Sequence, residues 1–414
     1  MIEGNRTPRV TLLGNFSQGE AGKLSVLVSM IKQLTKVSRR SILFEVSSGS
    51  PSFIRSYLGK DLDIIPFNAS SLTASFGYFG IPSLLSIKRS DLVVVVDESL
   101  RKKSWLNPFS NNLLGLFLVS KYAKLKGKPL VFLNTEAGEF TSGISRLVLK
   151  KLLEATDLIV CRDQVSRDNL HGLLLSKPVF CTANLAVSKS EETGRVGVKA
   201  LSALGVERQA NQFLLALEAP NSNSSAELDL ISEAVAGLKL NRNLDTVLFS
   251  FQEGSYQIAR NLSDRIATIY HEISGKSWRP AIVSSRDHLP EQLRSVLMSF
   301  DLFAVTSTQA LTFAMGAKLP VVTMPVADHF RDLAQINDQQ GLFLNLPVLD
   351  AAFLEEKIIE VLSSGELLSS NQVHQRAKII DKSHDAVELI VKKFFSLPGR
   401  VPGLSKKFSN AQFE

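Results

Sequence analysis

Apolar residues along the chain follow two spacings, short continuous runs and longer stretches in which they recur every three or four positions. Residues 9–13 form the first run, and residues 20–34 form the first helical stretch. Continuous runs are typical of strands that are covered on both faces, and helices between them are typical of parallel sheets with right-handed crossovers. The pattern therefore predicts an α/β fold.

The same alternation divides the chain into two halves. Strands are expected at 9–13, 41–46, 91–96, 130–133, 158–161, 213–217, 246–251, 280–283, 302–305 and 321–324. The pattern loosens between residues 187 and 212, where polar and charged residues gather, and then restarts. The expected organisation is an N-terminal Rossmann-like domain over 1–190, a linker over 191–210, a C-terminal Rossmann-like domain over 211–370, a helix over 371–402 that can pack back on the first domain, and a flexible tail over 403–414.

Size and composition agree with two ordinary globular domains. The 414 residues exceed what one hydrophobic core usually supports, and 44% of them are apolar against 21% charged. Cys161 and Cys181 lie in apolar runs, so buried core thiols are expected rather than a disulfide framework or a cysteine-rich zinc site. No metal-ligand cluster is visible, and neither a resident cofactor nor a metal is expected.

The first residues, the lengths of the apolar runs and the charge bear on the cellular location and the partners of the protein. The first residues carry no apolar signal core, and no apolar run reaches the roughly 20 residues of a membrane span, so a cytoplasmic protein is expected. The net charge is +7, with Lys and Arg spread along the chain. Peripheral contact with anionic membrane surfaces stays open, whereas aromatic residues make up only 7% and do not alternate with basic ones, so nucleic acid is not an expected partner.

Four motifs along the chain resemble those of one enzyme family. Residues 14–20 read Gly-Asn-Phe-Ser-Gln-Gly-Glu between the first strand and helix, where the family has an Asn–aromatic–Gly turn. Residues 123–129 match a helix-to-strand passage, and Arg162-Asp163-x-x-Ser166 after a strand matches the most specific family motif. Residues 302–320 match a strand, an alanine-rich helix and a closing proline. In this order and spacing, the four motifs resemble those of the polysaccharide pyruvyl transferase family, and the resemblance spans most of the chain.

The resemblance implies two Rossmann-like domains facing across a cleft, as in GT-B glycosyltransferases. It implies transfer of a pyruvyl group from phosphoenolpyruvate to hydroxyls of a glycan or lipid-linked saccharide for a surface or extracellular polysaccharide. Oligomeric state is left open. The residues expected to bind substrate are Asn15, Gly19, Glu20, Lys23, Arg162, Asp163, Ser166, Arg286 and His288.

Several family positions are changed in this chain. The family's Arg-Leu-His-Ala element is Ser307-Thr308-Gln309-Ala310 here, so its arginine and histidine are both absent. The activity is then either lost or carried by replacements, for which Gln309, His329 and Arg331 are the catalytic candidates. All three sit in or beside loops that follow second-domain strands, where sheets of this kind bind ligands.

Structural roles compete with these functional ones. Gly19 can be a simple turn residue, Arg162 and Asp163 a structural ion pair, Asp163 or Ser166 a helix cap, and His329 a surface residue. Gln309 can cap the helix that it opens. Two other functions also compete: a nucleotide-sugar glycosyltransferase of GT-B type, and a diverged binding protein without catalysis.

Overall fold

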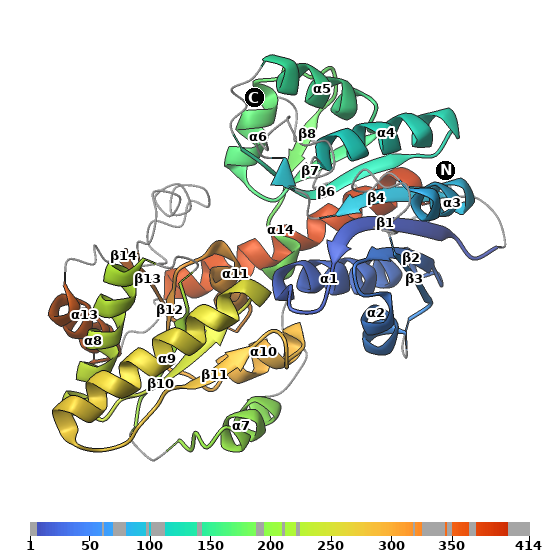
Figure 1. The fold of residues 1–414 in the computed structure, drawn as a ribbon. Helices are drawn as coiled ribbons and strands as arrows, with labels where there is room; N and C mark the ends of the chain where they lie inside the picture. Colours follow the sequence, from blue (N-terminus) through green and yellow to red (C-terminus); the bar gives the residue numbers. More distant parts are fainter. Residues whose placement is uncertain are drawn as a thin grey trace.

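The structure is a computed structural model. It describes residues 6–59, 62–68, 80–96, 99–100, 112–138, 143–187, 194–208, 212–220, 224–317, 319–324, 344–345, 350–363 and 370–395. Within these ranges the chain forms two α/β domains, each built on one parallel sheet (Figure 1).

The first sheet has the strand order β3-β2-β1-β4-β6-β7-β8, with the short β5 beside β6. Its strands are β1 (Arg9–Phe16), β2 (Leu43–Ser48), β3 (Ile64–Asn68), β4 (Leu92–Val96), β5 (Ser99–Leu100), β6 (Leu130–Ala137), β7 (Leu158–Cys161) and β8 (Val179–Cys181). One face is covered by α1 (Ala21–Ser38) and α2 (Pro51–Leu58). The other face is covered by α3 (Ile81–Arg89), α4 (Asn112–Leu125), α5 (Gly143–Glu154) and α6 (Gln164–His171).

The second sheet repeats this plan in the order β11-β10-β9-β12-β13-β14. Its strands are β9 (Leu214–Glu218), β10 (Asp245–Ser250), β11 (Ala281–Ser284), β12 (Leu302–Val305), β13 (Val321–Thr323) and β14 (Leu344–Asn345). One face packs on α8 (Ser225–Arg242), α9 (Glu253–Ser274) and α13 (Ala351–Ser363), and the other on α7 (Gly194–Ala203), α10 (Pro290–Leu297) and α11 (Thr308–Ala317).

Both sheets reverse their strand order beside the first strand of the domain. The reversal lies between β1 and β4 in the first sheet and between β9 and β12 in the second. Ligands of doubly wound sheets bind beyond the carboxyl ends of the strands at such points. The expected fold class, two Rossmann-like domains, is therefore confirmed.

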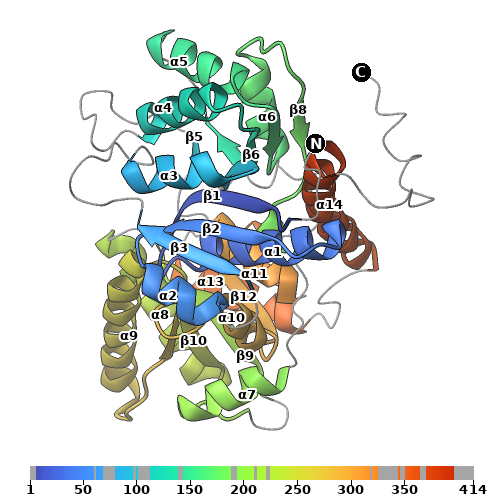
Figure 2. The same ribbon diagram turned by 90° about the vertical axis from the view of Figure 1, so that its right-hand side faces the viewer.

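Two segments tie the domains together. The short helix η1 (Leu185–Val187) follows β8 and contributes to both cores. The long helix α14 (Ser370–Phe394) buries Ile380 in the core of the second domain, while its end, from Ala386 onward, packs in the core of the first against α1 (Figure 2). Its apolar face thus bridges both domains.

The stretch between the domains contains a helix that the sequence pattern did not indicate. Helix α7 packs against α10, and the amide of Gly197 donates to Ser295 Oγ at 3.0 Å. A methyl group on Gly197 would lie 2.0 Å from the main-chain oxygen of Ser295. This contact involves rigid main chain, so the helices could not stay this close.

We therefore expect Gly197→Ala to lower the free energy of unfolding by about 3 kcal/mol, as overpacked sites do. Gly254→Ala is the matched control, because no atom lies near its methyl position. Urea unfolding of both variants measures the difference. An unchanged midpoint for Gly197→Ala would contradict the close approach of α7 and α10.

Candidate functional site

The turn between β1 and α1 contacts the second domain directly. The Gly19 oxygen accepts a hydrogen bond from Ser285 Oγ at 2.7 Å, and Gln18 Nε2 donates to the Arg286 oxygen at 3.2 Å. The amide of Ala21 donates to the Phe251 oxygen at 3.4 Å. The ends of β1, β10 and β11 therefore meet at one boundary between the domains.

On the first-domain side of this boundary, strand β1 ends later than the sequence pattern predicts. Strand β1 continues through Asn15 to Phe16, because the Ser47 hydroxyl bonds both main-chain groups of Gly14 and holds it against β2. Gly19 has φ +86, a left-handed conformation that favours glycine. Asn15 is exposed, whereas Glu20, at the N-cap of α1, and Lys23, in its first turn, are half-buried.

The second-domain side carries a cation and an imidazole after β11. The Arg286 guanidinium lies 4.9 Å from the centre of the Tyr256 ring, in a cation–π geometry, and residue 286 is exposed. His288 Nδ1 lies 3.2 Å from the Ser284 oxygen. Because a carbonyl oxygen only accepts, this contact is a hydrogen bond in the tautomer that carries the proton on Nδ1.

Gln309 faces the boundary from the first turn of α11. Its Oε1 accepts from Gln252 Nε2 at 3.2 Å, and its Nε2 donates to the Phe251 oxygen at 3.4 Å. A methyl group on Gly22 would lie 2.8 Å from Gln309 Nε2, so α1 approaches this side chain closely. The cap of α11 is Ser307, whose hydroxyl accepts from the Ala310 amide, so Gln309 does not serve as that cap and its side chain bonds Gln252 and Phe251 where α1 approaches.

Glu218, the last residue of β9, fixes the turn that carries Gln309. The carboxylate is 3% exposed and accepts from the amides of Thr306 at 2.7 Å and Ser307 at 2.8 Å, and from the Ser307 hydroxyl. Burial raises its pKa, which these hydrogen bonds partly offset. Its carboxylate takes up donors at the start of α11 that an anionic ligand would otherwise use.

Arg162, Asp163 and Ser166 make structural contacts on the first domain. Arg162 pairs with Glu136 at 2.7 Å, and Asp163 caps α6 by accepting from the Ser166 amide at 2.7 Å. The Ser166 hydroxyl accepts from the Ala137 amide. These residues follow β7, which β4 and β6 separate from β1 in the sheet. Their contacts hold the ends of β6 and α6 together.

Two of the catalytic candidates, His329 and Arg331, lie outside the described residues. Within the described ranges, no group of three or more His, Cys, Asp or Glu side chains is placed to hold a metal ion. Likewise, none of the helices in the described ranges is long and apolar enough to cross a membrane.

The two cysteines lie side by side on β7 and β8, where Cys161 pairs with Cys181 in the sheet register. Cys161 is fully buried and Cys181 is half-buried, and burial raises the pKa of Cys181 to about 11. Both therefore stay protonated at neutral pH, as core thiols do.

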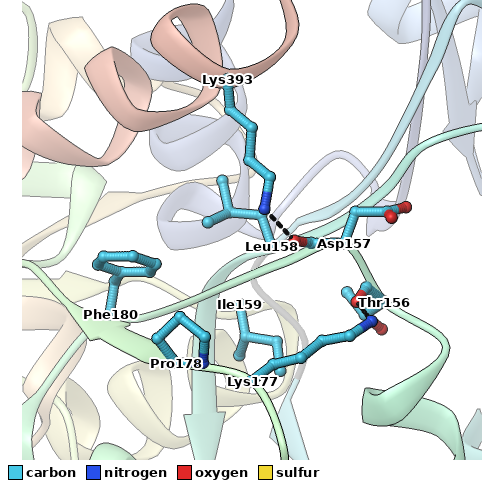
Figure 3. Close-up of a pocket in the computed structure, with 8 residues that line it drawn as sticks. All are labelled: Thr156, Asp157, Leu158, Ile159, Lys177, Pro178, Phe180 and Lys393. Carbon is cyan, nitrogen blue, oxygen red and sulfur yellow. Dashed lines mark hydrogen bonds between the residues drawn. The ribbon is translucent and has the colours of Figure 1, made fainter.

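A cavity of about 240 Å³ lies away from the boundary, at the edge of the sheet where β7 and β8 begin (Figure 3). Lys177 Nζ donates to the oxygens of Glu154 and Thr156, and Lys393 Nζ donates to the oxygen of Asp157. These ammonium groups hold the end of α5 and the end of α14 against the sheet. We interpret this cavity as a packing gap and not as a ligand site, because it lies at the amino ends of the strands, whereas sheets of this kind bind ligands beyond the carboxyl ends.

Sequence reasoning missed Glu218, Gln252, Ser285 and Tyr256. One signal was present for Glu218, because a carboxylate that ends an otherwise apolar run (Leu-Leu-Ala-Leu-Glu) is expected to be buried with partners. The other three depend on contacts between segments that are far apart in the sequence.

The comparisons with known proteins bear on both the family and the fold. A family model described as polysaccharide pyruvyl transferase matches residues 29–325, which is more than half of the chain. No curated protein matches the chain significantly.

Solved structures with a similar fold cover nearly the whole chain. A UDP-GlcNAc 2-epimerase from Methanocaldococcus jannaschii has a TM-score of 0.61 at 10% identity, covering 93% of this chain and 99% of that one. The enzyme of the same name from Neisseria meningitidis, bound to UDP-GlcNAc, has a TM-score of 0.59 at 13% identity and covers 93% of this chain and 100% of its own. A glycosyltransferase from Rickettsia africae has a TM-score of 0.58 at 11% identity and covers 94% of this chain and 98% of its own. At these identities the likeness shows the fold alone.

Proposed function

Because this chain belongs to the polysaccharide pyruvyl transferase family, we propose that it transfers a pyruvyl group from phosphoenolpyruvate to two hydroxyls of a saccharide acceptor. The family indicates a polysaccharide acceptor. The reaction adds one hydroxyl oxygen to the central carbon of the donor while the methylene carbon takes a proton. Phosphate then leaves as the second hydroxyl adds, and each hydroxyl gives up its proton.

The boundary between the domains supplies groups suited to these steps. Arg286 can hold the donor's carboxylate or phosphate, since guanidinium groups bind both oxyanions with paired hydrogen bonds. Lys23 adds a second cation from the first turn of α1. His288, in the tautomer with its proton on Nδ1, can accept a hydroxyl proton at Nε2. Glu20 is the carboxyl group closest in sequence to Lys23 and can return a proton.

The observation that carries this proposal is the direct contact between the Gly19 turn and the Ser285–Arg286 turn. It brings the ends of strands from both sheets together, with residues of both domains at one place. A reaction between a small anionic donor and a larger acceptor benefits from such a site, because two domains can position two substrates.

Thermal shift with phosphoenolpyruvate against nucleoside diphosphates tests the donor. We expect phosphoenolpyruvate to raise the melting temperature and UDP or GDP to leave it unchanged. Stabilisation by a nucleoside diphosphate alone would instead favour a nucleotide-sugar glycosyltransferase. No stabilisation by any of them would favour a binding protein without this donor.

Arg286→Met should weaken the donor interaction specifically. We expect kcat/KM for phosphoenolpyruvate to fall about 100-fold, on the scale of one lost charge-assisted contact, with little change in unfolding because residue 286 is exposed. Steady-state phosphate release measures it. Arg260→Met, an exposed arginine on α9, is the control and should keep wild-type kinetics. Equal kinetics of both variants would remove Arg286 from the site.

A further inference from the structure

The three helices α3, α4 and α5, which lie on one face of the first sheet, carry a strong excess of positive charge. Together they contain seven Lys and Arg residues and a single carboxylate, Glu154. That carboxylate is already bonded, since it accepts from the amide and hydroxyl of Ser176. The basic residues are Lys88, Arg89, Lys121, Lys124, Arg146, Lys150 and Lys151. Of these, Arg89 pairs with Glu45 on β2 at 2.8 Å. The layer keeps a clear excess of basic residues, and helices α1 and α2 on the other face of the sheet are basic as well, with Lys23, Lys32, Lys36 and Arg55 and no carboxylate.

Large apolar side chains stand exposed among these charges. Ile81 and Leu85 on α3 are 62% and 50% exposed, Leu125 on α4 is 78% exposed, and Leu147 on α5 is 54% exposed. Lys124 and Lys126 flank Leu125 in the chain and are exposed as well. Four of the large apolar side chains that are exposed within the described residues therefore lie on this basic layer, where a partner that offers an apolar region could cover them.

The outer helices of the second domain have the opposite charge. Helices α8, α9 and α13 together carry nine Asp and Glu residues against five Lys and Arg. Both views place α4 and α5 toward one end of the molecule and α8 and α9 toward the other (Figure 1, Figure 2). An anionic surface would therefore attract the first domain and repel the second, which fixes one orientation.

We propose that the α3–α5 layer docks on the surface of an anionic phospholipid bilayer, without spanning it. Lysine and arginine side chains near such a surface gain from its negative potential, and exposed leucine and isoleucine side chains gain by entering the interface between headgroups and acyl chains. The combination of a basic layer with isolated apolar residues fits a bilayer better than a nucleic acid, which offers no comparable apolar region.

Vesicle flotation tests this docking independently of catalysis. The wild-type chain should float with vesicles of phosphatidylcholine mixed with phosphatidylglycerol and stay behind with phosphatidylcholine alone. The triple variant Lys121→Glu, Lys124→Glu, Lys151→Glu should bind the anionic vesicles about 100-fold more weakly, since each basic group near the surface contributes roughly fivefold. Raising salt from about 0.1 M to about 0.5 M should weaken wild-type binding in the same direction.

A second triple variant separates the position of the charges from their number. Arg242→Glu, Arg260→Glu, Lys276→Glu changes the net charge by the same amount on exposed second-domain residues and should bind anionic vesicles like the wild type. Leu125→Ser with Leu147→Ser should weaken binding to anionic vesicles with no change in salt dependence. Equal loss in both triple variants, or tighter binding to an anionic polymer such as heparin than to the vesicles, would overturn the proposal. Circular dichroism confirms that each variant folds.

Discussion

Glu218→Ala is expected to lower the free energy of unfolding by about 2–4 kcal/mol and to reduce kcat/KM about 100-fold. The substitution leaves the buried amide of Thr306 and the part-buried amide of Ser307 without their acceptor, and the loss for a buried amide costs about 1–3 kcal/mol. The turn into α11 would then shift, and with it Gln309, and small displacements of site groups cost rates on this scale. Urea unfolding and phosphate release measure the two effects.

Glu218→Gln separates the titration of this residue from its packing. Burial raises the pKa of Glu218 above its ordinary value of 4.5 in the folded chain, so the folded state favours the protonated carboxyl. The stability that this protonation contributes is present at low pH and is lost as pH rises through the folded pKa. The wild type should therefore lose stability relative to Glu218→Gln from about pH 4.5 upward. A difference that is independent of pH would contradict this burial.

Arg294→Ala should be the second large effect. Arg294 is 3% exposed on α10, and its guanidinium donates to Ser25 Oγ on α1 and to the Ala186 oxygen in η1 while lying 5.3 Å from the centre of the Phe313 ring. One side chain therefore contacts both domains and the helix between them. We expect the free energy of unfolding to fall by about 3 kcal/mol, because the variant loses buried hydrogen bonds and leaves a cavity in the packing at the same time.

The position of the domains gives this variant a readout besides stability. Loss of the Arg294 contacts should let the domains separate, which small-angle scattering detects as a larger radius of gyration. Arg260→Ala, an exposed arginine on α9, serves as the control and should change neither quantity. An unchanged radius with full stability would show that Arg294 does not join the domains.

Much of the fold could be predicted from the sequence because strands of a parallel sheet, covered on both faces, are continuous apolar runs. Residues 92–96, Leu-Val-Val-Val-Val, are buried throughout, as the pattern indicates for a strand between two helix layers. The end of β1 was predicted too early, since glycine and asparagine usually end strands. Here the Ser47 hydroxyl on the neighbouring strand keeps Gly14 in the sheet. Helix α7 was not predicted, because the polar residues just before it indicated a linker.

The candidate site was harder to predict because its contacts join distant segments. The sequence indicated the Gly19 turn and Arg286 separately, but the hydrogen bonds between them connect positions 266 and 268 residues apart. Gln309 was indicated by its place in the family motif, while its contact with Gln252 depends on how α9 and α11 pack. The Arg162 motif gave the strongest resemblance, yet its side chains serve as an ion pair and a helix cap.

Acceptor-dependent release of phosphate from phosphoenolpyruvate tests the central claim most directly. The purified chain would be incubated with phosphoenolpyruvate and a panel of saccharides, and phosphate would be followed together with the mass of the acceptor. We predict release that requires an acceptor, an acceptor that gains a pyruvyl ketal, and a fall of about 100-fold in kcat/KM in Arg286→Met but not in Arg260→Met. Absence of release across the panel, from a folded chain that phosphoenolpyruvate does not stabilise, would contradict it.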